Sequence, residues 1–208
     1  MLFSLWFLFP CLSIHASASA IPSPVLDTTG NSVLAGARYV ILPVLRGFGG
    51  GVTTGLAKDN NSCYGDVVQD RFEVSSGTPV VFSPVNGTKG AVKTLTDMYI
   101  QFTAIRGVDR CSPSLLWKLG KSSDSKLQYY LTTGGSSNIV SWFKISQNGR
   151  DYNLQFCPSV CCNVMCRAVG IYIDKGVRRL ALSDTPFRVM FKKVLECSCK
   201  RLSCFLNN

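Results

Sequence analysis

The apolar residues of this 208-residue chain come in short runs that Gly, Pro, Asn, Asp and Ser interrupt. Beyond residue 20, no stretch keeps a helical period for more than a turn or two. Apolar residues instead alternate with other residues at 187–191 and 154–156, which is typical of strands that bury one face. The pattern predicts twelve strands, at residues 38–45, 51–57, 66–69, 79–83, 98–105, 115–119, 127–132, 141–146, 152–156, 170–174, 178–182 and 187–193.

Twelve short strands with frequent turn signals indicate an all-β sandwich or barrel. A weak internal repeat favours the barrel, because ARYVIL, DMYIQF and DYNLQF each place a Tyr just ahead of apolar residues. Their spacing divides the chain into three units of about 55 to 60 residues with four strands each, which suits a threefold-symmetric barrel. One aromatic match per unit adds little, since Tyr and Phe are common in any strand.

The first twenty residues have the features of a signal peptide. An apolar run, MLFSLWFLFPCLSI, is followed by HASASA, in which Ala18-Ser19-Ala20 fits the small-x-small cleavage pattern. The run is shorter than the roughly twenty apolar residues of a membrane span, and no Lys or Arg precedes it. A buried N-terminal helix is the alternative. We expect a signal peptide at 1–20, one domain at 21–195 and a Cys-containing tail at 196–208 that is disordered or trimmed.

This interpretation predicts a chain that is secreted, or delivered to the vacuole. Its net charge is +10, but Lys and Arg are scattered, with only short pairs such as Arg178-Arg179 and Lys192-Lys193. Scattered charge is typical of a solvated surface rather than of a nucleic-acid site. We therefore expect neither a nucleic acid nor a membrane as partner, although the positive field favours acidic partners such as anionic cell-wall polymers or acidic protein surfaces.

The only histidine, His15, lies in the predicted signal peptide. The mature chain therefore cannot build a Ser-His-Asp or Cys-His catalytic centre, or a zinc site that uses imidazole. Its twelve Asp and Glu residues show no recognisable motif of paired catalytic carboxylates. The sequence predicts a protein that is not an enzyme and has no cofactor or metal.

Cysteines are frequent beyond the predicted cleavage site, and in an exported chain they indicate disulfides. Their number is odd, which leaves one thiol free or paired with another molecule. A zinc cluster at 157–166 is the alternative, but the spacing C-x3-C-C-x3-C there lacks the usual C-x2-C pairs. The cysteines are Cys63, Cys111, Cys157, Cys161, Cys162, Cys166, Cys197, Cys199 and Cys204.

The run VLDTTGNSVLAGARYVI at 25–41 resembles the signature of the plant Kunitz-type inhibitors, the soybean trypsin inhibitor family. The positions of that signature are filled by Val25, Asp27, Gly30, Val33, Tyr39 and Ile41. Further along, PVLRGFGGGVT, SNIVSWFKI, NLQFCPSVC and VGIYIDKGVRRLALSD are similar to the miraculin-like branch of the same family. These motifs occur in the family's order from about Val25 to Val194.

The resemblance implies an all-β fold, a β-trefoil of twelve strands in three pseudo-symmetric four-strand units. It also implies a protease inhibitor of plant defence, which presents a substrate-like loop to a serine protease or inhibits another endopeptidase class, cysteine proteases included. The alternative is a non-inhibitory, miraculin-like defence or storage protein that binds a glycan, a small ligand or a receptor. We expect a monomer, or a disulfide-linked dimer formed through the tail.

Two disulfides follow from the resemblance, Cys63–Cys111 and Cys157–Cys166. Miraculin-like proteins often add a third bridge between two cysteines separated by two residues. The corresponding residues here, Cys161 and Cys162, are adjacent, and a bridge between neighbours forms a strained ring.

The resemblance places the inhibitory loop between the fourth and fifth strands, at about 83–95. The residue that would enter the specificity pocket of the protease falls at Asn86, whereas trypsin-like proteases require Lys or Arg. Lys89 or Lys93 can serve if the loop is displaced by a few residues. Active relatives brace the loop with an Asn that corresponds to Ala35, so we expect a looser loop here. The predicted protease-binding residues are Pro84, Val85, Asn86, Gly87, Thr88 and Lys89.

Two N-glycosylation sequons lie in the predicted mature chain, Asn60-Asn61-Ser62 and Asn86-Gly87-Thr88. A glycan on Asn86 would stand where the cleft of the protease must close. We predict glycosylation at Asn60 and Asn86, with an unused sequon as the alternative.

Overall fold

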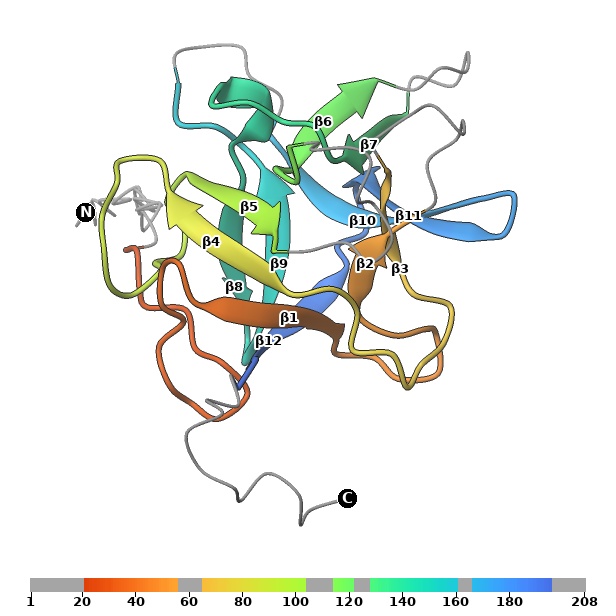
Figure 1. The fold of residues 1–208 in the computed structure, drawn as a ribbon, viewed down its shortest axis with the longest axis horizontal. Coiled ribbons are helices and arrows are strands. Elements are labelled where there is room, and N and C mark those ends of the chain that lie inside the picture. Colours follow the sequence, from red (N-terminus) through yellow and green to blue (C-terminus); the bar gives the residue numbers. More distant parts are fainter. Residues whose placement is uncertain (1–20, 56–64, 104–113, 122–127, 161–165, 196–208) are drawn as a thin grey trace, which may run out of the picture.

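The computed structural model describes residues 21–55, 65–103, 114–121, 128–160 and 166–195 (Figure 1). These residues form twelve strands and one 3-10 turn, η1 (Ile139–Ser141). The strands are β1 (Arg38–Pro43), β2 (Val52–Thr54), β3 (Val67–Gln69), β4 (Val80–Pro84), β5 (Met98–Phe102), β6 (Lys118–Lys121), β7 (Tyr129–Thr132), β8 (Lys144–Asn148), β9 (Asp151–Phe156), β10 (Arg167–Asp174), β11 (Val177–Ser183) and β12 (Arg188–Lys193).

The predicted strands are confirmed, because each observed strand overlaps one predicted range and the order is the same. β6 and β8 begin a few residues later than predicted. For β8 the reason is η1, which takes up Ser141 in a turn before the strand starts. This turn was not predicted from the sequence. Among the described residues, no helix is long and apolar enough to cross a membrane.

Six strands form a barrel. β1 pairs with β12 and β4, β4 pairs with β5, and β9 pairs with β8 and β12. The ring closes between β5 and β8, where Met98 and Phe143 exchange backbone hydrogen bonds of 2.9 Å in both directions. The barrel therefore has a continuous wall whose strands alternate inward and outward residues.

The other six strands form three hairpins, β2–β3, β6–β7 and β10–β11, which meet at one end of the barrel (Figure 1). β11 contacts both of the other hairpins, through Arg179 opposite Val68 and Ala181 opposite Tyr130. Each successive group of four strands thus supplies two barrel strands and one hairpin. This is the predicted β-trefoil, with units β1–β4, β5–β8 and β9–β12.

The core fills the barrel with side chains from all three units. Aromatic rings join the units across the interior, for example Phe82 of β4 with Phe191 of β12 at a centroid distance of 5.3 Å. The sequence repeat marks the first strand of each unit, but its tyrosines differ in their surroundings. Tyr39 is fully buried, whereas Tyr99 is only partly buried and its hydroxyl accepts a hydrogen bond of 3.0 Å from Trp142 Nε1.

An ion-pair cluster links the three hairpins. Arg179 on β11 pairs with Asp66 beside β3 and with Asp174 on β10, and its guanidinium lies over the ring of Tyr130 on β7. The side chain of Arg179 is only 11% exposed, and a charge this far from water needs such partners. We assign this cluster to the stability of the hairpin end.

The segment that precedes β1 carries the VLDTTGNSV motif and crosses one side of the barrel. It is shaped by Asp27, whose Oδ1 accepts hydrogen bonds from Thr29 N, Thr29 Oγ1 and Asn31 N at 2.7 to 3.1 Å. Burial alone would raise the pKa of Asp27, but these bonds, together with the charge of Lys193, hold the pKa below its ordinary value. Asp27 therefore holds this motif in an ordered turn.

Candidate functional site

The loop between β4 and β5 stands out from the barrel on the side away from the three hairpins (Figure 1). Its neck is closed by a hydrogen bond of 2.9 Å from Val85 N to the carbonyl of Asp97. Pro84 ends β4, and Val85 is half-buried at the neck. The neck holds the two ends of the loop together, so the residues between them project as one unit.

The tip of the loop, residues 86–90, is exposed at every position. It begins with a β-turn in which Gly87 N donates to the Pro84 carbonyl at 3.0 Å. Asn86 Oδ1 then accepts two hydrogen bonds from Thr88, from its N–H at 3.1 Å and its hydroxyl at 2.7 Å. Gly87 adopts a φ of 71°, a conformation that favours glycine. The side chain of Asn86 therefore lies against Thr88, within the loop.

Lys89 follows this turn and leads into the second limb of the loop. It is exposed, and its neighbour Gly90 has a φ of 99°. The carbonyl of Gly90 accepts a hydrogen bond of 2.8 Å from Ala35 N. The predicted position of Ala35 against the loop is thus observed, and the residue contacts the loop through its backbone, since a methyl group cannot form the hydrogen bond of an Asn side chain.

The second limb is tied to the segment before β1 along its whole length. Val92 is fully buried, donates to the Val33 carbonyl at 2.7 Å and accepts from Val25 N at 2.9 Å. Thr94 N donates to the Ser23 carbonyl at 2.8 Å. Lys93, the other basic candidate, lies within this paired stretch and forms a β-bridge with Pro24. Its backbone is therefore held against the protein and is not free to enter a cleft.

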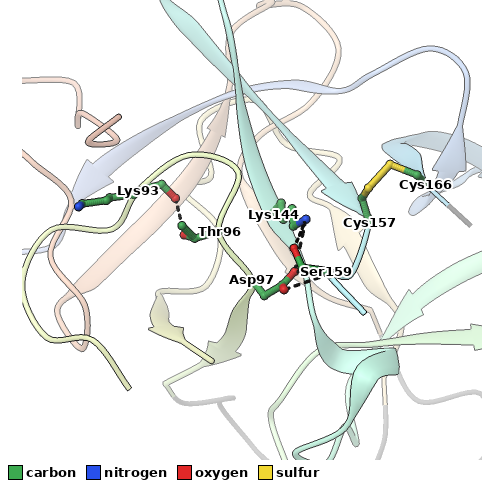
Figure 2. Close-up of polar contacts among 7 residues, drawn as sticks. All are labelled: Lys93, Thr96, Asp97, Lys144, Cys157, Ser159 and Cys166. Atoms are coloured by element: carbon green, nitrogen blue, oxygen red, sulfur yellow. Dashed lines mark hydrogen bonds and ion pairs between the residues drawn. A yellow bond between two sulfur atoms is a disulfide. The ribbon is translucent and has the colours of Figure 1, made fainter. Parts of the chain in front are cut away.

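The base of the loop is tied to the segment that follows β9 (Figure 2). Both carboxylate oxygens of Asp97 accept hydrogen bonds from Ser159 N, at 3.1 and 3.2 Å. Lys144 of β8 joins them, with its Nζ 3.7 Å from Asp97 Oδ1 and 2.6 Å from Ser159 Oγ. The side chains of Lys144 and Asp97 are only 12% and 13% exposed. These three residues, the Asp97 brace, fix the end of the loop to two other parts of the barrel.

A disulfide lies next to the brace. Cys157 and Cys166 are bonded at the end of β9 and the start of β10 (Figure 2), and Ser159 lies within the segment that they close. This is the pair that the family resemblance implies, and it holds the partner of Asp97 close to the barrel. The other predicted cysteine partners, Cys63 and Cys111, lie outside the described residues.

The structure brings the predicted protease-binding residues together as the neck and tip of one loop. Of the two predicted glycosylation sites, Asn86 is exposed at the tip, while Asn60 lies outside the described residues. The three residues of the brace were not predicted from the sequence. Their sequence positions carry no local signal, since Asp97 and Ser159 are 62 residues apart.

The arrangement can present a short exposed stretch whose two flanks are both fixed. If the chain were cut within the tip, Val85 on one side would still be bonded to Asp97, and Gly90 on the other side to Ala35. Fold and loop together define a class of protein, a β-trefoil with an exposed loop whose neck and second limb are hydrogen-bonded to the barrel and to the segment before β1.

Comparison with known proteins identifies the family. The family model described as trypsin and protease inhibitor, of the legume Kunitz type, matches residues 25–193. Kunitz trypsin inhibitor 5 from Arabidopsis thaliana is 39% identical over 203 residues, which cover 91% of this chain and 98% of the relative. Miraculin from Synsepalum dulcificum is 42% identical over 193 residues, covering 86% and 87%. The chain belongs to the Kunitz family of plant protease inhibitors.

Solved structures agree with this assignment. A Kunitz-type cysteine protease inhibitor from potato matches with a TM-score of 0.71 at 30% identity, covering 85% of this chain and all of the other. The resemblance found in the sequence is therefore confirmed. The family is one of protease inhibitors and not of enzymes, and its miraculin-like branch is represented among the relatives.

Proposed function

We propose that this chain inhibits a trypsin-like serine protease by inserting Lys89 of the β4–β5 loop into the specificity pocket. The observation that carries the proposal is the position of Lys89 at an exposed tip, between Val85, which is hydrogen-bonded to Asp97, and Gly90, which is hydrogen-bonded to Ala35. The pocket of a trypsin-like protease has an acidic floor, which the ammonium group of Lys89 would complement. Neither Asn86 nor Lys93 fits the pocket as well, because the side chain of Asn86 is folded onto Thr88 and the backbone of Lys93 is paired with Pro24.

Preorganisation is the physical basis of the expected affinity. A loop that already has its bound shape loses little conformational entropy on docking, so more of the contact energy appears as binding. Here the Asn86–Thr88 turn fixes the residues before Lys89, and the bond from Ala35 N to the Gly90 carbonyl fixes the residue after it. In active relatives, an Asn at the position of Ala35 braces the loop through its side chain. We propose that the bonds named above replace that brace here, because the methyl group of Ala35 cannot form hydrogen bonds.

The same bonds explain why the loop would act as an inhibitor rather than as a substrate. Hydrolysis after Lys89 would free a carboxylate and an amine, but Gly90 would stay bonded to Ala35, and Val85 on the other side of the cut would stay bonded to Asp97. The new ends would remain close together, which favours resynthesis of the bond and slow release. The chain would therefore bind an endopeptidase and would not itself catalyse a reaction.

A second function is supported by Asn86, which the sequence resemblance aligns with the family's pocket-entering position and which belongs to an exposed sequon. It is a non-inhibitory, miraculin-like protein that binds a glycan, a small ligand or a receptor. In either case we propose that the chain is exported to the extracellular space or the vacuole as a monomer with a Cys63–Cys111 disulfide.

Inhibition assays distinguish the two functions. The full chain with Asn86→Asp, expressed in a secretory host, keeps an oxygen to accept from Thr88 but cannot carry a sugar at the tip. We expect it to inhibit trypsin at submicromolar concentrations. Adding Lys89→Ala should weaken inhibition by about 100-fold, the loss expected for one buried anchor at an interface. The matched control is Lys175→Ala at the exposed tip of the β10–β11 hairpin, which removes the same charge.

Trypsin, chymotrypsin, subtilisin and papain are tested side by side. Full activity of all four at micromolar inhibitor would reject the inhibitory function and favour the second one. Inhibition of trypsin that Lys89→Ala leaves intact would reject Lys89 as the residue in the pocket.

A further inference from the structure

We propose that Asn86 is an N-glycosylation site and that its glycan closes the β4–β5 loop to proteases. The chain would then exist in an unmodified form that inhibits and a glycosylated form that does not. This inference rests on the proposed function, because a loop that binds no protease has nothing to close. It adds a covalent control of that loop to the proposed inhibition.

The geometry of the sequon supports modification of Asn86. Oδ1 of Asn86 accepts both hydrogen bonds from Thr88, and the whole tripeptide is exposed. These bonds occupy the oxygen of the amide, so its Nδ2 is the atom left to react. Both bonds lie within the tripeptide, so a nascent chain can form them before the barrel exists. The required Thr hydroxyl is thus already paired with the amide to be modified.

The modification would be the usual transfer of a preassembled oligosaccharide from a lipid pyrophosphate in the secretory pathway. Nδ2 of Asn86 forms a bond to the anomeric carbon of the first sugar and loses one proton. The bond from that carbon to the pyrophosphate oxygen breaks, and the lipid pyrophosphate leaves with its electron pair. No oxidant or reductant takes part.

In the folded protein the glycan would have room on one side of the loop. Asn86 and Thr88 line a hollow of about 240 Å³, together with Lys93 and Thr96 of the same loop and Pro22 of the segment before β1. A sugar attached to Asn86 can begin over this hollow without displacing the core. The modification is therefore compatible with the fold.

The same position is incompatible with a docked protease. Asn86 is three residues from Lys89, so their Cα atoms are at most about 11 Å apart. A typical protein interface covers about 800 Å² on each partner. A patch of that area centred on Lys89 extends beyond about 11 Å in every direction, so it includes Asn86. The limbs of the loop are tied by the Val92, Thr94 and Asp97 bonds, so the tip cannot swing away to carry the sugar out of the interface.

The experiment separates the modification from its effect. The full chain is expressed in a eukaryotic secretory host as Asn60→Gln, so that Asn86 is the remaining sequon. A lectin column divides the product into glycosylated and unmodified fractions, and peptide mass mapping reads residue 86 in each. The matched control, Asn60→Gln with Asn86→Asp, cannot be glycosylated and represents the product of enzymatic deglycosylation, which leaves an aspartate.

We expect a glycan on the peptide that contains Asn86. The glycosylated fraction should inhibit trypsin at least about 100-fold more weakly than the unmodified fraction. Treatment with a peptide-N-glycosidase should restore inhibition to within about threefold of the Asn86→Asp control, which is a change smaller than 1 kcal/mol.

Three results overturn parts of the proposal. Absence of sugar at residue 86 in every fraction rejects the modification site. Equal inhibition by the two fractions keeps the site and rejects the closure of the loop. If the unmodified fraction, which keeps the native Asn86, leaves trypsin active, both the inhibitory function and the closure are rejected, while the mass of the peptide still decides whether Asn86 is modified.

Discussion

The Asp97 brace gives the sharpest test of how the loop is held. Asp97→Ala removes the acceptor of the two Ser159 N–H contacts at 3.1 and 3.2 Å and leaves Lys144, which is 12% exposed, without its carboxylate. A hydrogen bond to a charged group contributes roughly 1.5 to 3 kcal/mol. We expect Asp97→Ala to lower the free energy of unfolding by about 2 kcal/mol, because the carboxylate is partly exposed and Lys144 keeps its bond to Ser159 Oγ.

The loss of this free energy in Asp97→Ala predicts three measurable changes. In a domain of this size, a loss of about 2 kcal/mol lowers the melting temperature by roughly 4 to 8 °C. If about 1.4 kcal/mol of it is spent in holding the loop in its bound shape, the inhibition constant for trypsin rises about tenfold. Trypsin should also hydrolyse the loop faster, because the cut ends are less well held. Asp97→Asn, which keeps an acceptor but loses the charge, should fall between Asp97→Ala and the parent.

The matched control is Asp184→Ala. Asp184 pairs with Arg167 at 2.9 Å, but its side chain is 93% exposed, and exposed pairs contribute little. Neither melting temperature nor inhibition should change. If Asp97→Ala lowers the melting temperature but leaves both the inhibition constant and the hydrolysis rate unchanged, Asp97 supports the barrel alone and does not position the loop.

Three other predictions concern neighbouring parts of the fold. Replacing Cys157 and Cys166 by Ser should cost roughly 2 to 3 kcal/mol and weaken trypsin inhibition as Asp97→Ala does; thermal unfolding with parallel inhibition assays checks this. Arg179→Ala should cost about 2 to 3 kcal/mol yet leave inhibition unchanged, since its cluster lies at the hairpin end. The pKa of Asp27 is lower in the folded chain than its ordinary 3.8, so its contribution to stability is present above about pH 4 and is lost as pH falls through the folded value. Asp27→Asn should therefore reduce the fall in unfolding free energy below pH 4, as measured by urea titration.

Much of the architecture can be predicted from the sequence because the responsible signals are local. A strand of a barrel with one buried face alternates apolar and polar residues, as 151–156 does. The turn that starts the loop tip is also local, since it needs only Asn86, Gly87 and Thr88. The family resemblance then supplied the order of the units and the role of the loop.

The support of the loop could not be predicted in the same way. The bond from Ala35 N to Gly90 joins two backbone groups, so no side chain marks it in the sequence. Asp97 and Ser159 lie in different units of the trefoil and meet only because the barrel closes between β5 and β8. The resemblance placed Asn86 at the pocket-entering position, but only the structure shows that its side chain accepts a hydrogen bond from Thr88.

The proposed function depends on the binding of Lys89 in the specificity pocket of a trypsin-like protease. It is tested most directly by incubating the full chain with Asn86→Asp and a catalytic amount of trypsin for an extended period. N-terminal sequencing then identifies the hydrolysed bond in the cut inhibitor. We expect a single new N-terminus at Gly90, in a chain that still binds trypsin. A first cut at any other bond, such as the one after Lys93, would contradict it.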